Sequence, residues 1–165
     1  MTAMGPEFSI SRVFDAPRDL VWKAFAERER LMQWWGSKGF TMLDAKLDLR
    51  PGGVFLYGMR SPDGHVMWGK WVYREIIAPE RLVAVVSFTD ERGNLLRHPM
   101  SPTWPLELLN TMTLEEHDGK TTLTVYGTPV NATEEERKTF DAGRGSMKQG
   151  FTGTLDQLAA YLAKT

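Results

Sequence analysis

The sequence contains no cysteine, which excludes disulfide bonds, thiolate metal sites and cysteine nucleophiles together. Its 20 basic and 21 acidic residues leave a net charge of -1, without the basic excess of a duplex nucleic-acid binder. No apolar run approaches the ~20 residues of a membrane span. Residues 1–9 lack the basic-then-apolar order of a signal peptide. We therefore expect a cytoplasmic protein with neither a nucleic-acid partner nor a membrane partner.

Motifs for metal, phosphate and nucleophile chemistry are also missing. The three histidines, His65, His98 and His117, lack the close spacing of a zinc site, so we expect no metal. No glycine-rich phosphate loop joins a predicted strand to a helix, and no nucleophile elbow of the G-x-S-x-G type occurs. We therefore expect no cofactor. The sequence leaves catalysis open but favours a binding protein over an enzyme.

The chain has 165 residues, a length that suits one domain over residues 1–165. Alternating apolar and polar residues predict strands over 8–14, 42–49, 54–60, 65–77, 81–89, 108–117 and 121–127. Helical spacing predicts two short helices after the first strand, over about 17–25 and 29–34. The sequence therefore predicts an α+β domain in which a curved antiparallel sheet of about six or seven strands surrounds a long C-terminal helix.

The C-terminal helix is predicted to begin at Thr133, where Glu136 completes a capping box. Gly143 and Gly145 lie inside its span, and each glycine costs about 1 kcal/mol relative to alanine in a helix interior. Two alternatives follow. Either the small residues leave space beside the helix, or they break it, so that the long helix starts at about Ser146.

Large apolar side chains gather on one face of the predicted strands. In the longest strand, Trp71, Tyr73, Glu75 and Ile77 share a face, and charged residues mark the opposite, solvent side. This pattern predicts a hydrophobic cavity between the sheet and the C-terminal helix. Its predicted wall consists of Trp35, Phe55, Tyr57, Met59, Trp71, Tyr73, Glu75, Phe88, His98, Trp104, Met112, Met147, Phe151 and Leu155.

Glu75 is the candidate catalytic residue, because a carboxylate that points into an apolar interior must be paired or must raise its pKa. It could act as a general base with Tyr57 or His98, or it could anchor a polar part of a ligand. The alternative is an internal salt bridge that orders the sheet.

Residues 97–105 hold three prolines and form a candidate lid. Met100 and Trp104 could cover the mouth of the cavity, and Arg97 or His98 could meet an anionic group of a ligand. The alternative is a rigid connecting loop whose tryptophan fills the core.

Several short motifs together carry a resemblance to a known family. They are residues 13–17 (VFDAP), 34–36 (WWG), 50–53 (RPGG), 79–82 (PERL), 118–121 (DGKT) and 150–151 (GF). With these motifs the chain resembles homologues of the activator of heat-shock protein 90 ATPase, within the START-like (SRPBCC, Bet v-like) superfamily. The resemblance spans nearly the whole chain and implies a helix-grip fold with an internal cavity.

Three functions follow as expectations. The cavity favours binding of a small hydrophobic or amphipathic ligand. The resemblance implies, as an alternative, a co-chaperone-like interaction with the heat-shock protein 90 system. A third alternative is a cavity-based acid–base enzyme that uses Glu75. A homodimer is also open, through Val72 and the valine-rich strand over 81–89 acting as a sheet edge.

Overall fold

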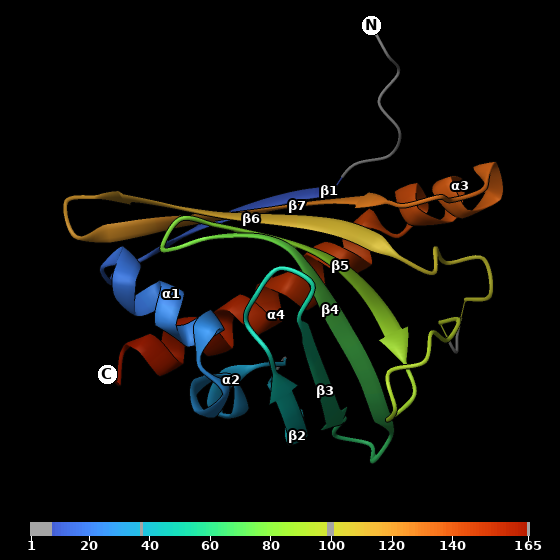
Figure 1. Cartoon of the computed structure of the whole chain (residues 1–165), viewed down its shortest axis with the longest axis horizontal. Helices are drawn as coiled ribbons and strands as arrows, with labels where there is room; N and C mark the ends of the chain where they lie inside the picture. Colours follow the sequence, from blue (N-terminus) through green and yellow to red (C-terminus); the bar gives the residue numbers. More distant parts are fainter. Residues whose placement is uncertain (1–7, 37, 99–100, 165) are drawn as a thin grey trace, which may run out of the picture.

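The computed structural model describes residues 8–36, 38–98 and 101–164. Seven strands form one antiparallel sheet in the order β1-β7-β6-β5-β4-β3-β2 (Figure 1). The strands are β1 (Phe8–Phe14), β2 (Thr41–Leu47), β3 (Val54–Arg60), β4 (Val66–Ile77), β5 (Arg81–Thr89), β6 (Leu108–His117) and β7 (Lys120–Pro129). The helices are α1 (Arg18–Ala26), α2 (Arg28–Trp34), α3 (Glu134–Ala142) and α4 (Arg144–Leu162). The predicted α+β helix-grip architecture is confirmed.

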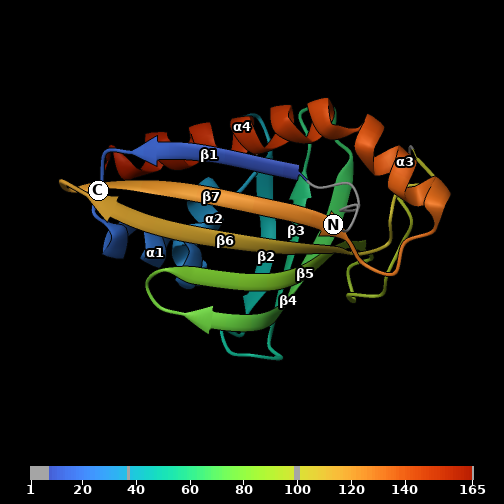
Figure 2. The same ribbon diagram turned by 90° about the horizontal axis from the view of Figure 1, so that it is seen from above.

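The sheet is strongly curved. Figure 2 shows β2 and β3 running across the direction of β1 and β7, with α4 lying along the hollow side. Register shifts interrupt the ladders between Met42 and Asp44 and between Tyr73 and Glu75, and such bulges bend strands. Helices α1 and α2 close one end of the hollow, where Phe25 and Trp34 are buried edge to face.

The C-terminal helical segment consists of two helices. Thr133 accepts a hydrogen bond from the backbone N–H of Glu136, and the Glu136 carboxylate accepts one from the backbone N–H of Thr133, so the predicted capping box is confirmed. Helix α3 ends before Gly143, and α4 begins at Arg144. The alternative with a helix break therefore holds, with the second helix starting slightly before Ser146.

The predicted dimer edge is wrong. Both β4 and β5 lie inside the sheet, and Val72 is paired on both sides, with Val54 of β3 and Val85 of β5. The edges are β1 and β2. Alternation along a strand reports which side chains face inward but does not report strand order, so the sequence could not locate the edges. No helix in the described ranges is long and apolar enough to cross a membrane.

Candidate functional site

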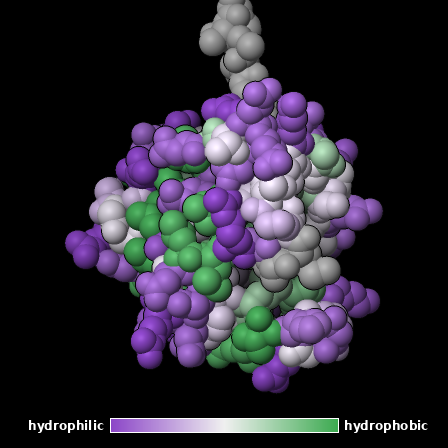
Figure 3. Space-filling view, turned by 90° about the vertical axis from the view of Figure 1, so that its right-hand side faces the viewer, coloured by the Kyte–Doolittle hydropathy of each residue, from purple (hydrophilic) through white to green (hydrophobic). Residues whose placement is uncertain are grey.

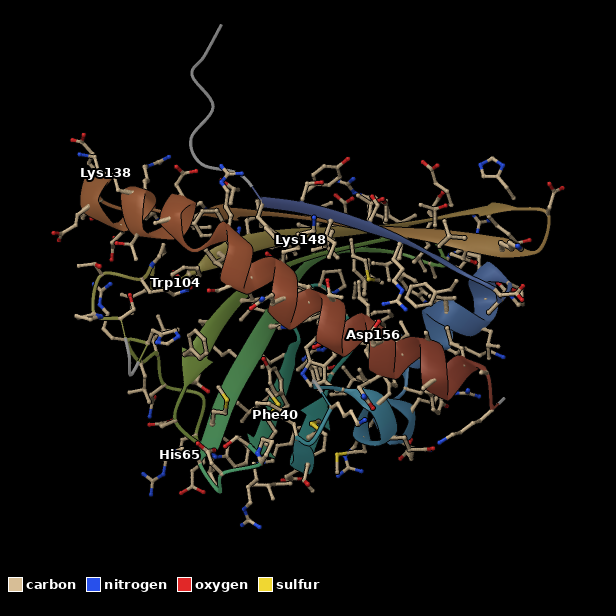
Figure 4. All side chains as sticks on the ribbon, turned by 180° about the vertical axis from the view of Figure 1, so that it is seen from behind. Phe40, His65, Trp104, Lys138, Lys148 and Asp156 are labelled. Carbon is tan, nitrogen blue, oxygen red and sulfur yellow. The ribbon has the colours of Figure 1, made fainter. Side chains whose placement is uncertain are left out.

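A cavity of about 330 Å³ lies between α4 and the hollow face of the sheet. Its lining consists of Trp35, Gly36, Phe40, Tyr57, Met59, Met67, Trp71, Val86, Ser87, Phe88, Trp104, Pro105, Leu106, Leu108, Asn110, Met147, Gly150, Phe151 and Thr154. Two of these, Trp104 and Phe40, lie on the side of α4 that faces the β3–β4 turn (Figure 4). At this end of the molecule apolar side chains reach the surface within a mostly hydrophilic surround (Figure 3).

Residues at regular spacing along the strands and α4 form much of this lining. Strands β3 and β6 contribute alternate residues, with Tyr57 and Met59 on β3 and Leu108 and Asn110 on β6, whereas β5 contributes the consecutive residues 86–88. Helix α4 contributes Met147, Gly150, Phe151 and Thr154, at the i, i+3, i+4, i+7 spacing of one helical face. The cavity therefore lies between one face of one helix and the inward side of β3 to β6.

Eight of the predicted wall residues line this cavity, namely Trp35, Tyr57, Met59, Trp71, Phe88, Trp104, Met147 and Phe151. Met112 and Leu155 instead line a deeper hollow of about 30 Å³. Phe55 and Tyr73 are almost fully buried behind the lining. The His98 ring contacts the rings of Phe88 and Trp104, at 4.9 and 6.3 Å between centroids. A ligand-binding role for these residues stays a prediction.

The expected inward orientation of Glu75 is wrong. Strand β4 bulges between Tyr73, which pairs with Ala84, and Glu75, which pairs with the adjacent Val83. The extra residue reverses the alternation, so the Glu75 side chain is 45% exposed. Its Oε1 accepts a hydrogen bond from Arg81 Nε at 2.5 Å. Glu75 therefore forms an ion pair at the surface and is not a candidate general base of the cavity.

The prediction also missed residues that line the cavity. Asn110 could have been found, because it lies two residues before Met112 on β6 and therefore faces the same side of the sheet. Met67 could have been found in the same way, because it lies four residues before Trp71 on β4 and faces the same side. Phe40 comes from the segment before β2, for which the sequence pattern assigns no direction.

A network of aromatic rings forms the floor of the cavity beside α2. The Trp35 ring meets Phe55, Tyr57 and Trp71 edge to face, with centroid distances of 6.0, 5.6 and 5.2 Å. Gly69 allows Tyr57 to lie flat, since a Cβ atom there would stand 2.6 Å from the Tyr57 hydroxyl. Such packing holds the rings in place, so this wall is preformed.

The cavity is electrically neutral. Every described residue that lines the main cavity or the deeper hollow has an uncharged side chain. Burial raises the pKa of Tyr57 from its ordinary value of 10.0 to about 12, so its hydroxyl is neutral at pH 7 and stays so in mildly alkaline solution. Burial also lowers the pKa of His98, which favours a neutral imidazole behind Trp104. In the described part of the chain no group of three His, Asp or Glu side chains could hold a metal ion.

The segment before β6 is tied to α3. Arg97 forms an ion pair with Glu136 and donates a second hydrogen bond to the backbone oxygen of Trp104 at 3.2 Å. The Trp104 ring packs on Phe140, with 5.6 Å between centroids. Arg97 is thus engaged within the protein, and the expected role of Met100 falls outside the described residues. Trp104 both lines the cavity and anchors this loop on α3.

Comparison with known proteins agrees with this architecture. The Mycobacterium smegmatis protein Ms6760 is 29% identical, with a TM-score of 0.78 over 96% of this chain and 91% of that chain. An Arthrobacter aurescens protein is 28% identical, with a TM-score of 0.77 over 98% of this chain and 88% of that chain. The Nitrosomonas europaea protein NE0264 shares the fold at 22% identity, with a TM-score of 0.78 over 99% and 97% of the two chains.

No curated protein matches the chain. The family model described as Activator of Hsp90 ATPase homolog 1-like protein matches residues 15–163, which include the motifs that carried the resemblance from residue 15 onward. The chain therefore belongs to the family of Activator of Hsp90 ATPase homolog 1-like proteins.

Proposed function

We propose that this protein binds a small hydrophobic or amphipathic ligand in the cavity between the sheet and α4. The observation that carries the proposal is the space of about 330 Å³ enclosed by apolar and aromatic side chains. Ligand sites in proteins typically measure about 300–1,000 Å³ and are lined mainly by such residues, with a few polar groups. The space lies at the lower end of that range, which suits a compact ligand.

Gly150 supports the proposal from the helix side. It lies within α4 and lines the cavity, and a Cβ atom added to it would meet no other atom within 4 Å. Glycine in a helix interior costs about 1 kcal/mol relative to alanine. Close packing does not require a glycine where alanine would fit, whereas an open binding space does benefit from the missing side chain.

The test measures binding of N-phenyl-1-naphthylamine, an uncharged dye whose fluorescence rises in apolar surroundings. Gly150→Phe places a ring in the cavity and should abolish saturable binding. Gly145→Phe is the matched control, because Gly145 lies in the same helix, has open space around it and does not line the cavity. The proposal fails if the folded wild type binds no dye, or if both variants bind it equally well.

An interaction with a chaperone is the second candidate, and the family description alone favours it. Its test is the ATPase rate of the heat-shock protein 90 of the same organism, with and without this protein. A rate that does not change at saturating concentrations rules this candidate out. The acid–base alternative is not proposed, because Glu75 lies outside the cavity in an ion pair with Arg81.

A further inference from the structure

Two of the polar residues that line the cavity, Asn110 and Thr154, lie where it meets the deeper hollow. Five residues line both spaces, namely Trp35, Trp71, Asn110, Phe151 and Thr154. Asn110 comes from β6 and Thr154 from the facing side of α4. An amide from the sheet and a hydroxyl from the helix therefore border the same narrow region at the inner end of a mainly apolar space.

Asn110 is placed by two small neighbours in the sheet. It pairs with Ala84 of β5 and with Gly127 of β7. A Cβ atom on Gly127 would stand 2.9 Å from Asn110 Oδ1, so the amide occupies the space that this glycine leaves open. The sheet thus provides a recess for the Asn110 side chain, and an alanine at position 127 would displace it.

The hydrogen-bonding capacity of these two side chains is largely unused by the protein. Within residues 8–36, 38–98 and 101–164, no hydrogen bond joins the Asn110 amide to another residue, although the amide offers one acceptor and two donors. Thr154 donates to the backbone oxygen of Gly150 at 3.1 Å and keeps its lone pairs as acceptors. A ligand that displaces water from this region must satisfy these groups, because a polar group left unpaired in an apolar site weakens binding.

No charged side chain of the described residues lines the cavity, and several charged side chains near it are paired within the protein. Arg97 pairs with the buried Glu136 of α3, and Asp156 of α4 pairs with Arg12 of β1. Lys148 of α4 is exposed and does not line the cavity. An ionised ligand would therefore lose its hydration without gaining a countercharge, which is strongly unfavourable.

From these observations we infer that the cavity takes an uncharged amphipathic ligand, whose carbonyl, amide or hydroxyl group is held by Asn110 and Thr154 at the inner end, and that it rejects the ionised acid of the same shape. This inference rests on the proposed binding function and adds the chemical class of the ligand. The apolar part of the ligand lies against Trp35, Trp71 and Phe151.

The experiment compares two probes of the same shape, 2-naphthamide and 2-naphthoate, in displacing N-phenyl-1-naphthylamine at pH 7.5. Wild type should bind the amide at least about ten-fold more tightly than the acid, since an uncompensated buried charge is costly. Asn110→Leu should lower the affinity for 2-naphthamide by about ten-fold, the size expected for one lost hydrogen bond. It should lower the affinity for 2-naphthoate less. Thr111→Val, on the other face of the same strand, is the matched control and should leave both affinities unchanged.

The outcomes separate this inference from the proposed function. If the dye itself fails to bind folded wild type, the proposed function is wrong and the inference falls with it. If the dye binds but the two probes compete equally, or neither competes, the inference is wrong and the proposed function stands. If Asn110→Leu lowers the affinities for 2-naphthamide and 2-naphthoate equally, Asn110 does not hold the polar group of the ligand.

Discussion

Trp104 lies against Gly143, so that ring atom Cζ3 is 2.8 Å from the position that a Cβ atom on Gly143 would occupy. Gly143 ends α3 and precedes α4, while Trp104 lines the cavity. The junction between the two helices and the wall of the cavity are therefore in direct contact. A change in one is expected to alter the other.

Gly143→Ala tests this contact. The backbone of Gly143, with φ -88° and ψ 4°, is accessible to alanine, so the effect is steric and not conformational. We expect a loss of about 1–3 kcal/mol in the free energy of unfolding, as for other overpacked sites. Urea denaturation measures it. Gly145→Ala, which meets open space, is the control and should be neutral or stabilising. Equal stability of the two variants would contradict the contact.

The ion pair between Arg97 and Glu136 ties the loop before β6 to α3. The Glu136 side chain is 10% exposed, and its hydrogen bond from Arg97 is the largest of the causes that hold the pKa of this carboxyl below its usual value. Glu136→Gln keeps a capping oxygen but loses the charge, so we expect a cost of about 1–2 kcal/mol at pH 7.

The pH dependence of this cost follows from the direction of the pKa shift. A carboxyl whose pKa is lower in the folded state stabilises fully above its unfolded pKa and loses this contribution as the pH falls through its folded pKa. The difference between wild type and Glu136→Gln should therefore shrink in acid, as urea denaturation at pH 7 and pH 3 can show. Glu134→Gln is the control, because Glu134 is 85% exposed and should change stability by less than about 1 kcal/mol. A difference that grows in acid would contradict this account.

His98 should make the stability depend on pH near neutrality. Burial lowers its pKa below the ordinary value of 6.5, so the unfolded chain binds the proton more readily. The contribution of His98 to the free energy of unfolding is therefore complete above about pH 6.5, and it is lost as the pH falls toward the pKa of His98 in the folded state. NMR titration of the His98 ring should give a midpoint below 6.5, and His98→Gln should flatten the stability curve in that window. A midpoint at or above 6.5 would exclude this source of pH dependence.

Glu75→Gln should leave ligand affinity unchanged. Glu75 and Arg81 are both nearly half exposed, and such surface pairs contribute about 0–1 kcal/mol to stability. Titration with N-phenyl-1-naphthylamine measures the affinity, and thermal unfolding measures the small loss of stability. A large loss of binding in this variant, with its fold intact, would show that the carboxylate faces the cavity after all.

The sequence was sufficient for the fold because local signals were strong. Alternation located β3 and β6 with the bounds that the structure shows, and the capping box located the start of α3. It was insufficient for Glu75, because the bulge after Tyr73 has no glycine or proline to mark it and yet reverses every later side chain of β4.

The cavity was predictable only in part. Aromatic and methionine residues on regular elements were located by their period, including Trp71 on β4 and Phe151 on α4. The recess at Asn110 depends on its pairing with Ala84 and Gly127, which are distant in sequence and become neighbours only when β5, β6 and β7 align. Strand order and register are set by the tertiary structure, so the sequence pattern of a single strand could not predict this polar site.

The central claim is that a neutral ligand occupies the space under α4, and NMR titration with 2-naphthamide tests it most directly. We expect the largest backbone chemical-shift changes at Asn110, Gly150 and Thr154. A second groove, near the end of β5 and lined by Val66, Trp68 and Leu96 among others, offers the alternative location. Changes confined to that groove, or no saturable changes at all, would contradict the account.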